Sequence, residues 1–355
     1  MNRYVILVMS LLASPVVFSQ GPNDSGAYYQ AADGKRGVEL KTALFRIVSP
    51  HTVVSYTPGV WQAVNSYDLR DDGKIWDIYS GISNFTPGDD QNKGVEGKEG
   101  DTYNREHAMP RSWFKEANQE NNTTKVYPMY TDLHHLFPTD TYVNGLRSNY
   151  PYGELEKGAN PTKQSEGGFS KFGICDPAIG YVVVNGKARV FEPADEYKGD
   201  LARVYFYMAT AYESYKNEKG IERSPADWDS SDKTMLDGTV FPFFKPWALN
   251  MLLRWAWQDP VSEKEIRRNE AIFGIQNNRN PFVDYPRLEQ YIWGVYADEA
   301  FSYDHYVQPE TTAINGIVTG QSVDGRWYDL RGRRVTADRP RKGVYIRNKR
   351  KVVIN

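Results

Sequence analysis

The stretch YNREHAMPRSWF, residues 103–114, decides how this sequence is interpreted. It places a carboxylate and an imidazole, Glu106 and His107, next to each other, shortly before Arg111. Neighbouring side chains on a regular strand point to opposite faces. We therefore expect an irregular backbone at this point if both side chains serve one site.

A second polar stretch, TDLHHLFPTDTYVNGLRSNYPYG, follows at residues 131–153. Its first half has the composition of a strand and is interrupted by prolines. After Pro138, either Thr139 or Asp140 can cap a short helix. The two stretches together predict a strand, a loop, a second strand and a short helix over about residues 103–149.

These two stretches concentrate the residue types that do chemistry. The chain has five histidines, and three of them fall here. The candidate residues are Glu106, His107, Arg111, Asp132, His134, His135, Asn144, Arg147 and Asn149. Gathering of titratable groups favours an active site over structural loop histidines. Because His134 and His135 are neighbours, we expect at least one of them to face away from such a site.

Several kinds of site are excluded by missing motifs. The HExxH pattern of zinc proteases is absent, as is the GxSxG turn of serine hydrolases. A structural zinc site needs several Cys or His at fixed spacing. A hard divalent cation held by one carboxylate and one amide oxygen fits better, because such ions keep several water ligands.

The rest of the chain predicts a globular protein with mixed secondary structure. Of its 355 residues, 40% are hydrophobic and 25% are charged, which are ordinary values. Apolar periodicity predicts helices over residues 37–47, 60–67, 200–215, 247–257 and 262–274. We predict an α+β fold for residues 20–295, a linker over 296–315, and a small basic β-rich module over 316–355.

Charge is unevenly distributed along the chain. The net charge is −2, yet residues 321–355 hold eleven Lys or Arg against three Asp. The preceding residues are therefore acidic overall, whereas a nucleic-acid-binding protein usually carries a basic footprint. Any nucleic-acid site in the body of the protein must then be a local patch.

The N-terminus, MNRYVILVMSLLASPVVFSQ, has the form of a secretory signal peptide ending near residue 19. It predicts export, with the protein secreted or held at the cell surface. No later stretch is long and apolar enough to span a membrane. Cys175 is the only cysteine, so no internal disulfide can form. We expect a monomer.

The quoted motifs closely resemble the secreted endonuclease I family of non-specific nucleases, which belongs to the ββα-metal, or His-Me finger, group. Similarity extends through FEPADEYKGDLARVYFYMATAY at 191–212 and NPFVDYPRLEQYIWG at 280–294. The tail, YDLRGRRV…KGVYIRNKRKVVIN, is similar to C-terminal sorting domains of exported Bacteroidetes proteins. It implies a partner in the secretion machinery; the rival interpretation is a basic arm that tethers DNA.

The resemblance implies a role for each matched residue. His107 matches the family's general base, while Glu106 and Asn144 match its metal ligands. The metal would be Mg²⁺, or another divalent cation such as Mn²⁺ or Ca²⁺. Arg111 and Arg147 are the candidates for the arginine at the scissile phosphate. The remaining candidates, Asp132, His134, His135 and Asn149, would support the ligands or contact phosphate.

The implied function is metal-dependent hydrolysis of phosphodiester bonds in DNA, with RNA as a second possible substrate, to products with 5′-phosphate ends. Phosphate contacts carry no base information, so sequence preference should be weak. Two alternatives stay open at this point. One is an exported nucleic-acid-binding or glycan-binding protein without catalysis, and the other is a phosphoesterase that acts on a different substrate.

Overall fold

The structure is a computed structural model that describes residues 21–92, 97–114, 128–183, 186, 188–217 and 220–310. Beyond these it describes the backbone of four short strands in the C-terminal region. The predicted signal peptide, residues 1–19, lies outside the described residues, as does the end of the predicted linker.

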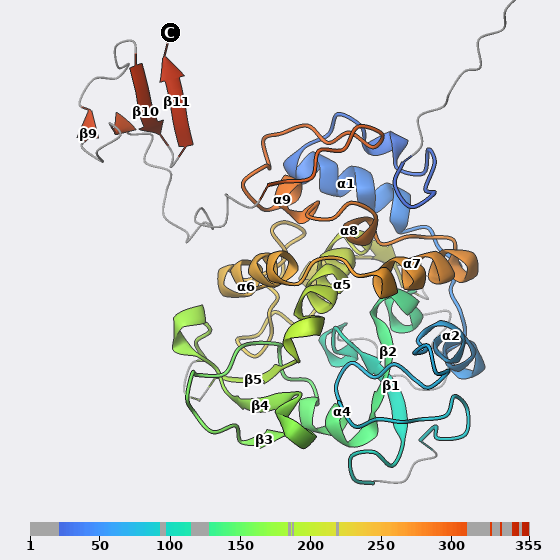
Figure 1. The fold of residues 1–355 in the computed structure, drawn as a ribbon. Coiled ribbons are helices and arrows are strands. Elements are labelled where there is room, and N and C mark those ends of the chain that lie inside the picture. The colour runs from blue at the N-terminus through green and yellow to red at the C-terminus, as the bar shows by residue number, and fades with distance from the viewer. Residues whose placement is uncertain are drawn as a thin grey trace, which may run out of the picture.

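Helices form most of the regular structure (Figure 1). They are α1 (Gly37–Val48), α2 (Trp61–Tyr67), α4 (Thr141–Arg147), α5 (Lys198–Ala211), α6 (Pro246–Gln258), α7 (Glu263–Gln276), α8 (Pro281–Asp284) and α9 (Glu289–Ile292). Short turns include η2 (Tyr56–Val60), η4 (Pro128–Thr131) and η5 (Leu133–His135). The five helical ranges expected from apolar periodicity are confirmed, with ends shifted by a few residues.

Helix α5 lies at the centre of the body and is buried along its whole length. It packs against α1, α6 and α8. Its sequence, KGDLARVYFYMATA, is mostly apolar, and apolar residues on all sides are typical of a helix surrounded by other elements. The core around it is rich in aromatic side chains, including Tyr205, Phe206 and Trp255.

Strands β1 (Tyr103–His107) and β2 (Leu136–Asp140) pair antiparallel, and α4 follows β2 directly. The register places Glu106 opposite Phe137 and His107 opposite Leu136. Asp140 caps α4, because its carboxylate accepts a hydrogen bond from Val143 N at 3.0 Å. The predicted strand, loop, strand and short helix are therefore present.

One expectation about this unit is wrong. The ladder continues to His107, so the backbone at Glu106 and His107 is regular strand. The two side chains leave opposite faces of β1. A site that uses both must therefore wrap around the end of the strand.

The other strands form small antiparallel sheets. In the body these are β3 (Lys163–Gln164), β4 (Lys171–Ile174) and β5 (Arg189–Glu192) in the order 3-4-5, and the pair β6 (Tyr215–Lys216) and β7 (Glu222–Arg223). The C-terminal region has β8 (Trp327–Tyr328), β9 (Arg334–Val335), β10 (Gly343–Arg347) and β11 (Arg350–Ile354) in the order 11-10-8-9.

The segment that follows α9 runs along the body. Tyr285 donates its hydroxyl to Tyr303 O, and Tyr291 donates to Val307 O. Arg287 donates to Pro309 O. These bonds hold the described part of the expected linker, residues 296–310, against α9 and the turn before it.

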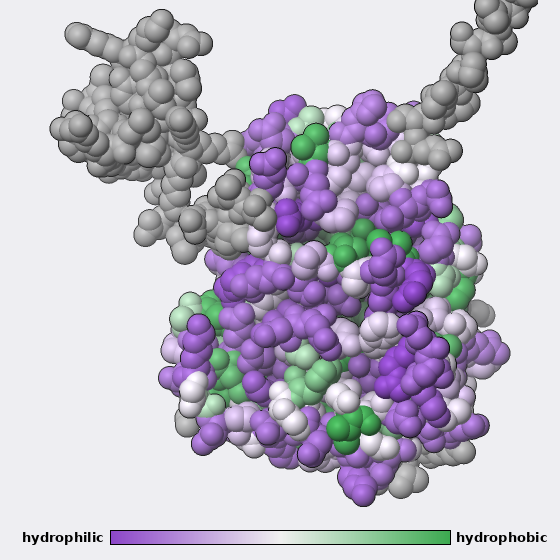
Figure 2. All heavy atoms as spheres, viewed as in Figure 1, coloured by the Kyte–Doolittle hydropathy of each residue, from purple (hydrophilic) through white to green (hydrophobic). Residues whose placement is uncertain are grey.

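Mixed helices and small sheets make this an α+β protein, as the sequence predicted. The face seen in Figure 2 is mostly hydrophilic, with hydrophobic residues in small separate patches. Within the described part of the chain, we find no helix with the length and apolar character needed to cross a membrane.

Candidate active site

Glu106 is a buried carboxylate with two strong donors. The Tyr79 hydroxyl and Arg147 Nη1 both donate to Glu106 Oε1, each at 2.7 Å. The residue is only 4% exposed. Both of these bonds fall on Oε1, so Oε2 is the oxygen better placed to accept a further ligand.

Arg147, at the end of α4, is directed inward. Besides Glu106, it donates to the backbone carbonyls of His107 and Ala108. Its guanidinium carbon lies 4.7 Å from the centroid of the Tyr152 ring, and the residue is 1% exposed. This position fits a residue that orients Glu106 and the end of β1, and it does not fit the phosphate contact for which Arg147 was a candidate.

Asn144 lies on α4 and reaches the same carboxylate. A hydrogen bond from its side chain is among the interactions that lower the pKa of Glu106. Its Nδ2 also lies 3.4 Å from Thr139 Oγ1. Burial nevertheless dominates, and the pKa of Glu106 is raised above its ordinary value despite Arg147, Tyr79 and Asn144.

A divalent cation suits this donor set. A carboxylate oxygen and an amide oxygen are hard ligands. The amide group of Asn144 can be rotated by 180° so that its oxygen, rather than its nitrogen, points toward the cation. A cation at Oε2 would also favour the ionised form that burial opposes. Within the described ranges no group of three His, Cys, Asp or Glu side chains is arranged to hold a metal ion, so an ion bound by Glu106 and Asn144 would keep water ligands.

His107, the last residue of β1, lies on the other face of the strand. Its Nε2 is 2.9 Å from the Tyr130 carbonyl in η4, so Nε2 carries the proton and donates it. The second ring nitrogen, Nδ1, is then an acceptor in the neutral imidazole. The ring stacks on Tyr56 at 5.9 Å between centroids, with 24° between the planes.

The surroundings of His107 keep it neutral. Burial lowers its pKa well below the ordinary value of 6.5, and the nearby His135, Arg111 and Arg105 add to the effect. His107 is therefore a proton acceptor at neutral pH, as a general base must be.

Arg111 is half-buried and lies beside the His107 ring. Its Nη1 donates to the Tyr130 hydroxyl at 3.0 Å. Tyr130 in turn lies 5.1 Å from His107, measured between ring centroids. Of the two arginines predicted for the site, Arg111 is the one with a partly exposed side chain near the base.

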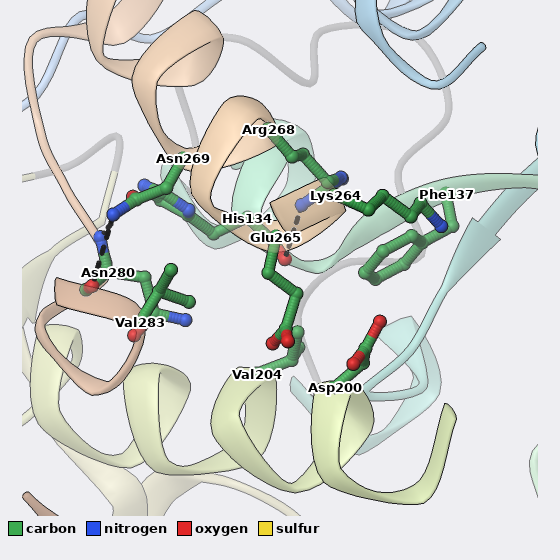
Figure 3. A pocket seen from close by; sticks show the side chains of 10 residues that line it. All are labelled: His134, Phe137, Asp200, Val204, Lys264, Glu265, Arg268, Asn269, Asn280 and Val283. Carbon is green, nitrogen blue, oxygen red and sulfur yellow. Dashed lines mark hydrogen bonds between the residues drawn. The ribbon is translucent and has the colours of Figure 1, made fainter. Parts of the chain in front are cut away.

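One of the two predicted neighbouring histidines lies away from this site. His134 lines a cavity of about 20 Å³ between α5 and α7, together with Asp200, Lys264 and other residues (Figure 3). Its ring lies 4.4 Å from Tyr207, and its Nε2 lies 3.3 Å from Asn278 O. His134 is thus part of the polar packing between helices, and it faces away from the site, as expected for one of the two neighbours.

His135 lies under His107, with 5.3 Å between the ring centroids. It is fully buried, and its Nε2 bonds the carbonyl of Met129. Consecutive carbonyls of η4, those of Met129 and Tyr130, therefore bond the two histidines. His135 supports the general-base candidate and does not reach the surface.

Asp132 and Asn149 occupy two further environments. Asp132 is fully buried and accepts hydrogen bonds from the hydroxyls of Tyr207 and Tyr212, both at 2.6 Å. Through its hydrogen bonds Asp132 joins η5 to α5. None of its described hydrogen bonds goes to Glu106 or His107. Asn149 is exposed just beyond α4.

The site also contains residues that the sequence did not single out. They are Tyr56, Tyr79, Tyr130 and Tyr152. Most of them lie in irregular segments far along the chain from β1. The only signal in the sequence was the high aromatic content of 14%, and this does not distinguish a site from a core.

Comparison with known proteins finds a matching family and several relatives. The sequence model of the family described as Endonuclease I matches residues 36–287. An extracellular ribonuclease of Bacillus amyloliquefaciens is 34% identical over 300 residues, covering 82% of this chain and 89% of the relative. One from Bacillus subtilis (strain 168) is also 34% identical, over 76% and 79% of the two chains.

More distant relatives carry other nuclease names. Endonuclease-1 of Buchnera aphidicola subsp. Acyrthosiphon pisum (strain APS) is 28% identical over 48% of this chain and 52% of its own length. The family match covers most of the chain and includes both halves of the site. The chain is therefore a nuclease, and it belongs to the endonuclease I family.

Proposed function

We propose that this protein is an exported endonuclease that depends on a divalent cation and hydrolyses DNA and RNA to products with 5′-phosphate ends. The observation that carries the proposal is the bond from His107 Nε2 to the Tyr130 carbonyl. This bond fixes the tautomer and leaves Nδ1 to accept a proton from water. The unit made of β1, β2 and α4 would then be a ββα-metal motif.

In this mechanism His107 acts as the general base. Its ring is held by the Tyr130 carbonyl and by stacking on Tyr56, so Nδ1 has a fixed direction. A water molecule bonded to Nδ1 loses its proton as its oxygen attacks phosphorus. The low pKa of His107 keeps the base neutral at the pH of most environments.

Glu106 and Asn144 would hold the cation, with Arg147 and Tyr79 orienting the carboxylate. When bound, a divalent cation polarises the phosphate and stabilises the leaving 3′ oxygen. The hydrogen bonds to Glu106 Oε1 keep this side chain in one position, so that Oε2 and the amide of Asn144 can be presented together. Mg²⁺ is the proposed ion, because it suits few protein ligands and several waters.

Both DNA and RNA are proposed as substrates. Some relatives of this chain are named extracellular ribonuclease, and others are named periplasmic or extracellular deoxyribonuclease. A site that contacts mainly phosphate does not distinguish the two sugars or the bases. We therefore expect cleavage of both polymers with weak sequence preference.

Export is proposed on two grounds. The N-terminal sequence has the form of a signal peptide, and the relatives' names place them outside the cytoplasm. The basic C-terminal region, with its short strands, is proposed as the part that engages the secretion machinery. The mature enzyme would act as a monomer.

The experiment uses purified protein with supercoiled plasmid DNA and with a long RNA. We expect nicking of the plasmid and fragmentation of the RNA in Mg²⁺, and loss of both in excess EDTA. Binding without cleavage would favour the non-catalytic alternative. Turnover of simple diesters without cleavage of either polymer would favour a phosphoesterase for another substrate.

A further inference from the structure

Arg105 lies on β1, two residues before His107, and its side chain leaves the same face of the strand. Its guanidinium carbon is 3.6 Å from the centroid of the Tyr56 ring and 4.3 Å from that of Trp61. The planar cation is thus held by the two aromatic rings. Stacking of this kind fixes the plane of a guanidinium and leaves its edge free to bind.

The charge of Arg105 has no carboxylate partner among the residues that the structure describes. Its Nη1 donates to Tyr56 O and to Thr57 Oγ1, and Nε is buried without a described partner. Four buried arginines of the body differ in this respect. Each of the following is paired with a carboxylate: Arg147, Arg203, Arg268 and Arg279.

Arg111 provides a second half-buried cation near the base. Its described bond goes to the Tyr130 hydroxyl. Tyr56 joins the two arginines, because its ring stacks on His107 and lies 4.8 Å from Tyr130. Both cations are linked to His107 through rings: Arg105 lies over Tyr56, and Arg111 donates to Tyr130, whose ring is 5.1 Å from that of His107.

These residues form a cationic surface that runs past the general base. We name it the Arg105–Arg111 surface, made of Trp61, Arg105, Tyr56 and Arg111, which the buried Tyr130 connects. Two half-buried cations without described carboxylate partners fit an anionic ligand that extends past His107. A guanidinium edge matches the geometry of phosphate oxygens.

We infer that Arg105 binds a phosphate of a nucleotide next to the scissile one, and so makes the enzyme selective for polynucleotides over dinucleotides. The inference rests on the proposed function, since it assumes that the scissile phosphate lies at His107. A dinucleotide has a single internal phosphate and cannot occupy both His107 and Arg105. A longer strand places successive phosphates along the Arg105–Arg111 surface.

The test compares Arg105→Gln and Arg105→Lys with the wild type on a long single strand and on a dinucleotide. For Arg105→Gln, we expect kcat/KM to fall on the long strand by a factor about tenfold larger than the factor by which it falls on the dinucleotide. The slope of log kcat/KM against log salt should become shallower by about one unit, as expected when one phosphate contact is lost. Arg105→Lys keeps the charge and should keep most of the slope.

Arg70→Gln is the matched control, because Arg70 is an exposed arginine paired with Asp72. It should leave both the substrate ratio and the salt slope as in the wild type. Thermal unfolding of each variant shows that it is folded, and Arg105→Lys serves as the charge-preserving test if Arg105→Gln does not fold.

Three results would overturn the inference. They are equal losses on both substrates with an unchanged salt slope, no loss on either, or a salt slope in Arg105→Lys as shallow as in Arg105→Gln. The first would make Arg105 only a support for Tyr56. Failure of the proposed function would look different, since the wild type itself would then cleave neither substrate in Mg²⁺.

Discussion

Arg147 and Glu106 form an ion pair of 2.7 Å in which the side chains are only 1% and 5% exposed. The pair joins the end of α4 to β1, and so fixes the carboxylate relative to Asn144 on the same helix. Its role is to orient a proposed metal ligand.

Arg147→Lys should raise the divalent-cation concentration needed for half-maximal cleavage by about 10–100-fold, a typical effect of losing a residue that orients a metal ligand. Lysine keeps the charge but cannot bond Glu106, His107 O and Ala108 O together. A titration of activity with Mg²⁺ measures the change. An unchanged midpoint in a folded variant would contradict the positioning role.

Asn144→Ala should weaken the response to the cation while leaving the fold nearly intact, because Asn144 is only partly buried on α4. We expect low activity at millimolar Mg²⁺ and partial recovery at higher concentration. The control is Tyr142→Ala, an exposed residue on the same helix. A wild-type Mg²⁺ profile for Asn144→Ala would remove it from the proposed ligand set.

Asp77 should be important for stability, since its carboxylate accepts hydrogen bonds from the Tyr79 and Asp140 backbone amides and from Ser83 Oγ. These bonds tie the loop that carries Tyr79 to the cap of α4. Asp77→Asn places an amide N–H against these donors and should lower the free energy of unfolding by about 2–4 kcal/mol.

Urea unfolding of Asp77→Asn, with Asp72→Asn as control, measures this loss. Asp72 is an exposed carboxylate paired with Arg70, so its replacement should leave the free energy of unfolding nearly unchanged. Equal stability of the two variants would show that the Asp77 network does not support the site.

His134 should make stability fall in mild acid. Burial, together with the positive charge of Arg268, lowers its pKa to about 4 from 6.5, against the opposing effect of Asp132. Between these values the unfolded chain binds a proton that the native state does not, so stability decreases as pH falls from about 6.5 to about 4. The contribution is up to about 3 kcal/mol.

The measurement is the free energy of unfolding as a function of pH. His134→Gln, which keeps a donor for Asn278 O, should show a flatter profile between pH 6.5 and 4. The pKa of His135 is also lowered, so part of the slope of stability against pH remains in the His134→Gln variant. His305→Gln, in an exposed loop, should follow the wild type. A His134→Gln profile as steep as that of the wild type would contradict the prediction.

Local sequence signals were enough to predict the elements around the site. Asp140 was one of two predicted caps for α4, and its carboxylate bonds Val143 N as a cap does. The helix at α7 begins with a capping box between Ser262 and Glu265, a signal carried by four residues. Such signals act within one turn, and so they can be recognised without knowledge of the fold.

The partners within the site could not be predicted in this way. Tyr79 reaches Glu106 from a loop 27 residues earlier in the chain, and Tyr56 reaches His107 from an irregular turn. Whether Arg147 faces substrate or the interior depends on how α4 packs against β1. These relationships come from tertiary packing, and an arginine or tyrosine in a loop carries no local sign of them.

His107→Ala is the most direct test of the central claim, that His107 is the general base of a metal-dependent nuclease. Plasmid nicking in Mg²⁺ should be lost by at least about 100-fold, the lower end of the contribution from a general base. The variant should remain folded, and His305→Ala should nick as the wild type does. Cleavage by a folded His107→Ala at a rate close to that of the wild type would contradict the account.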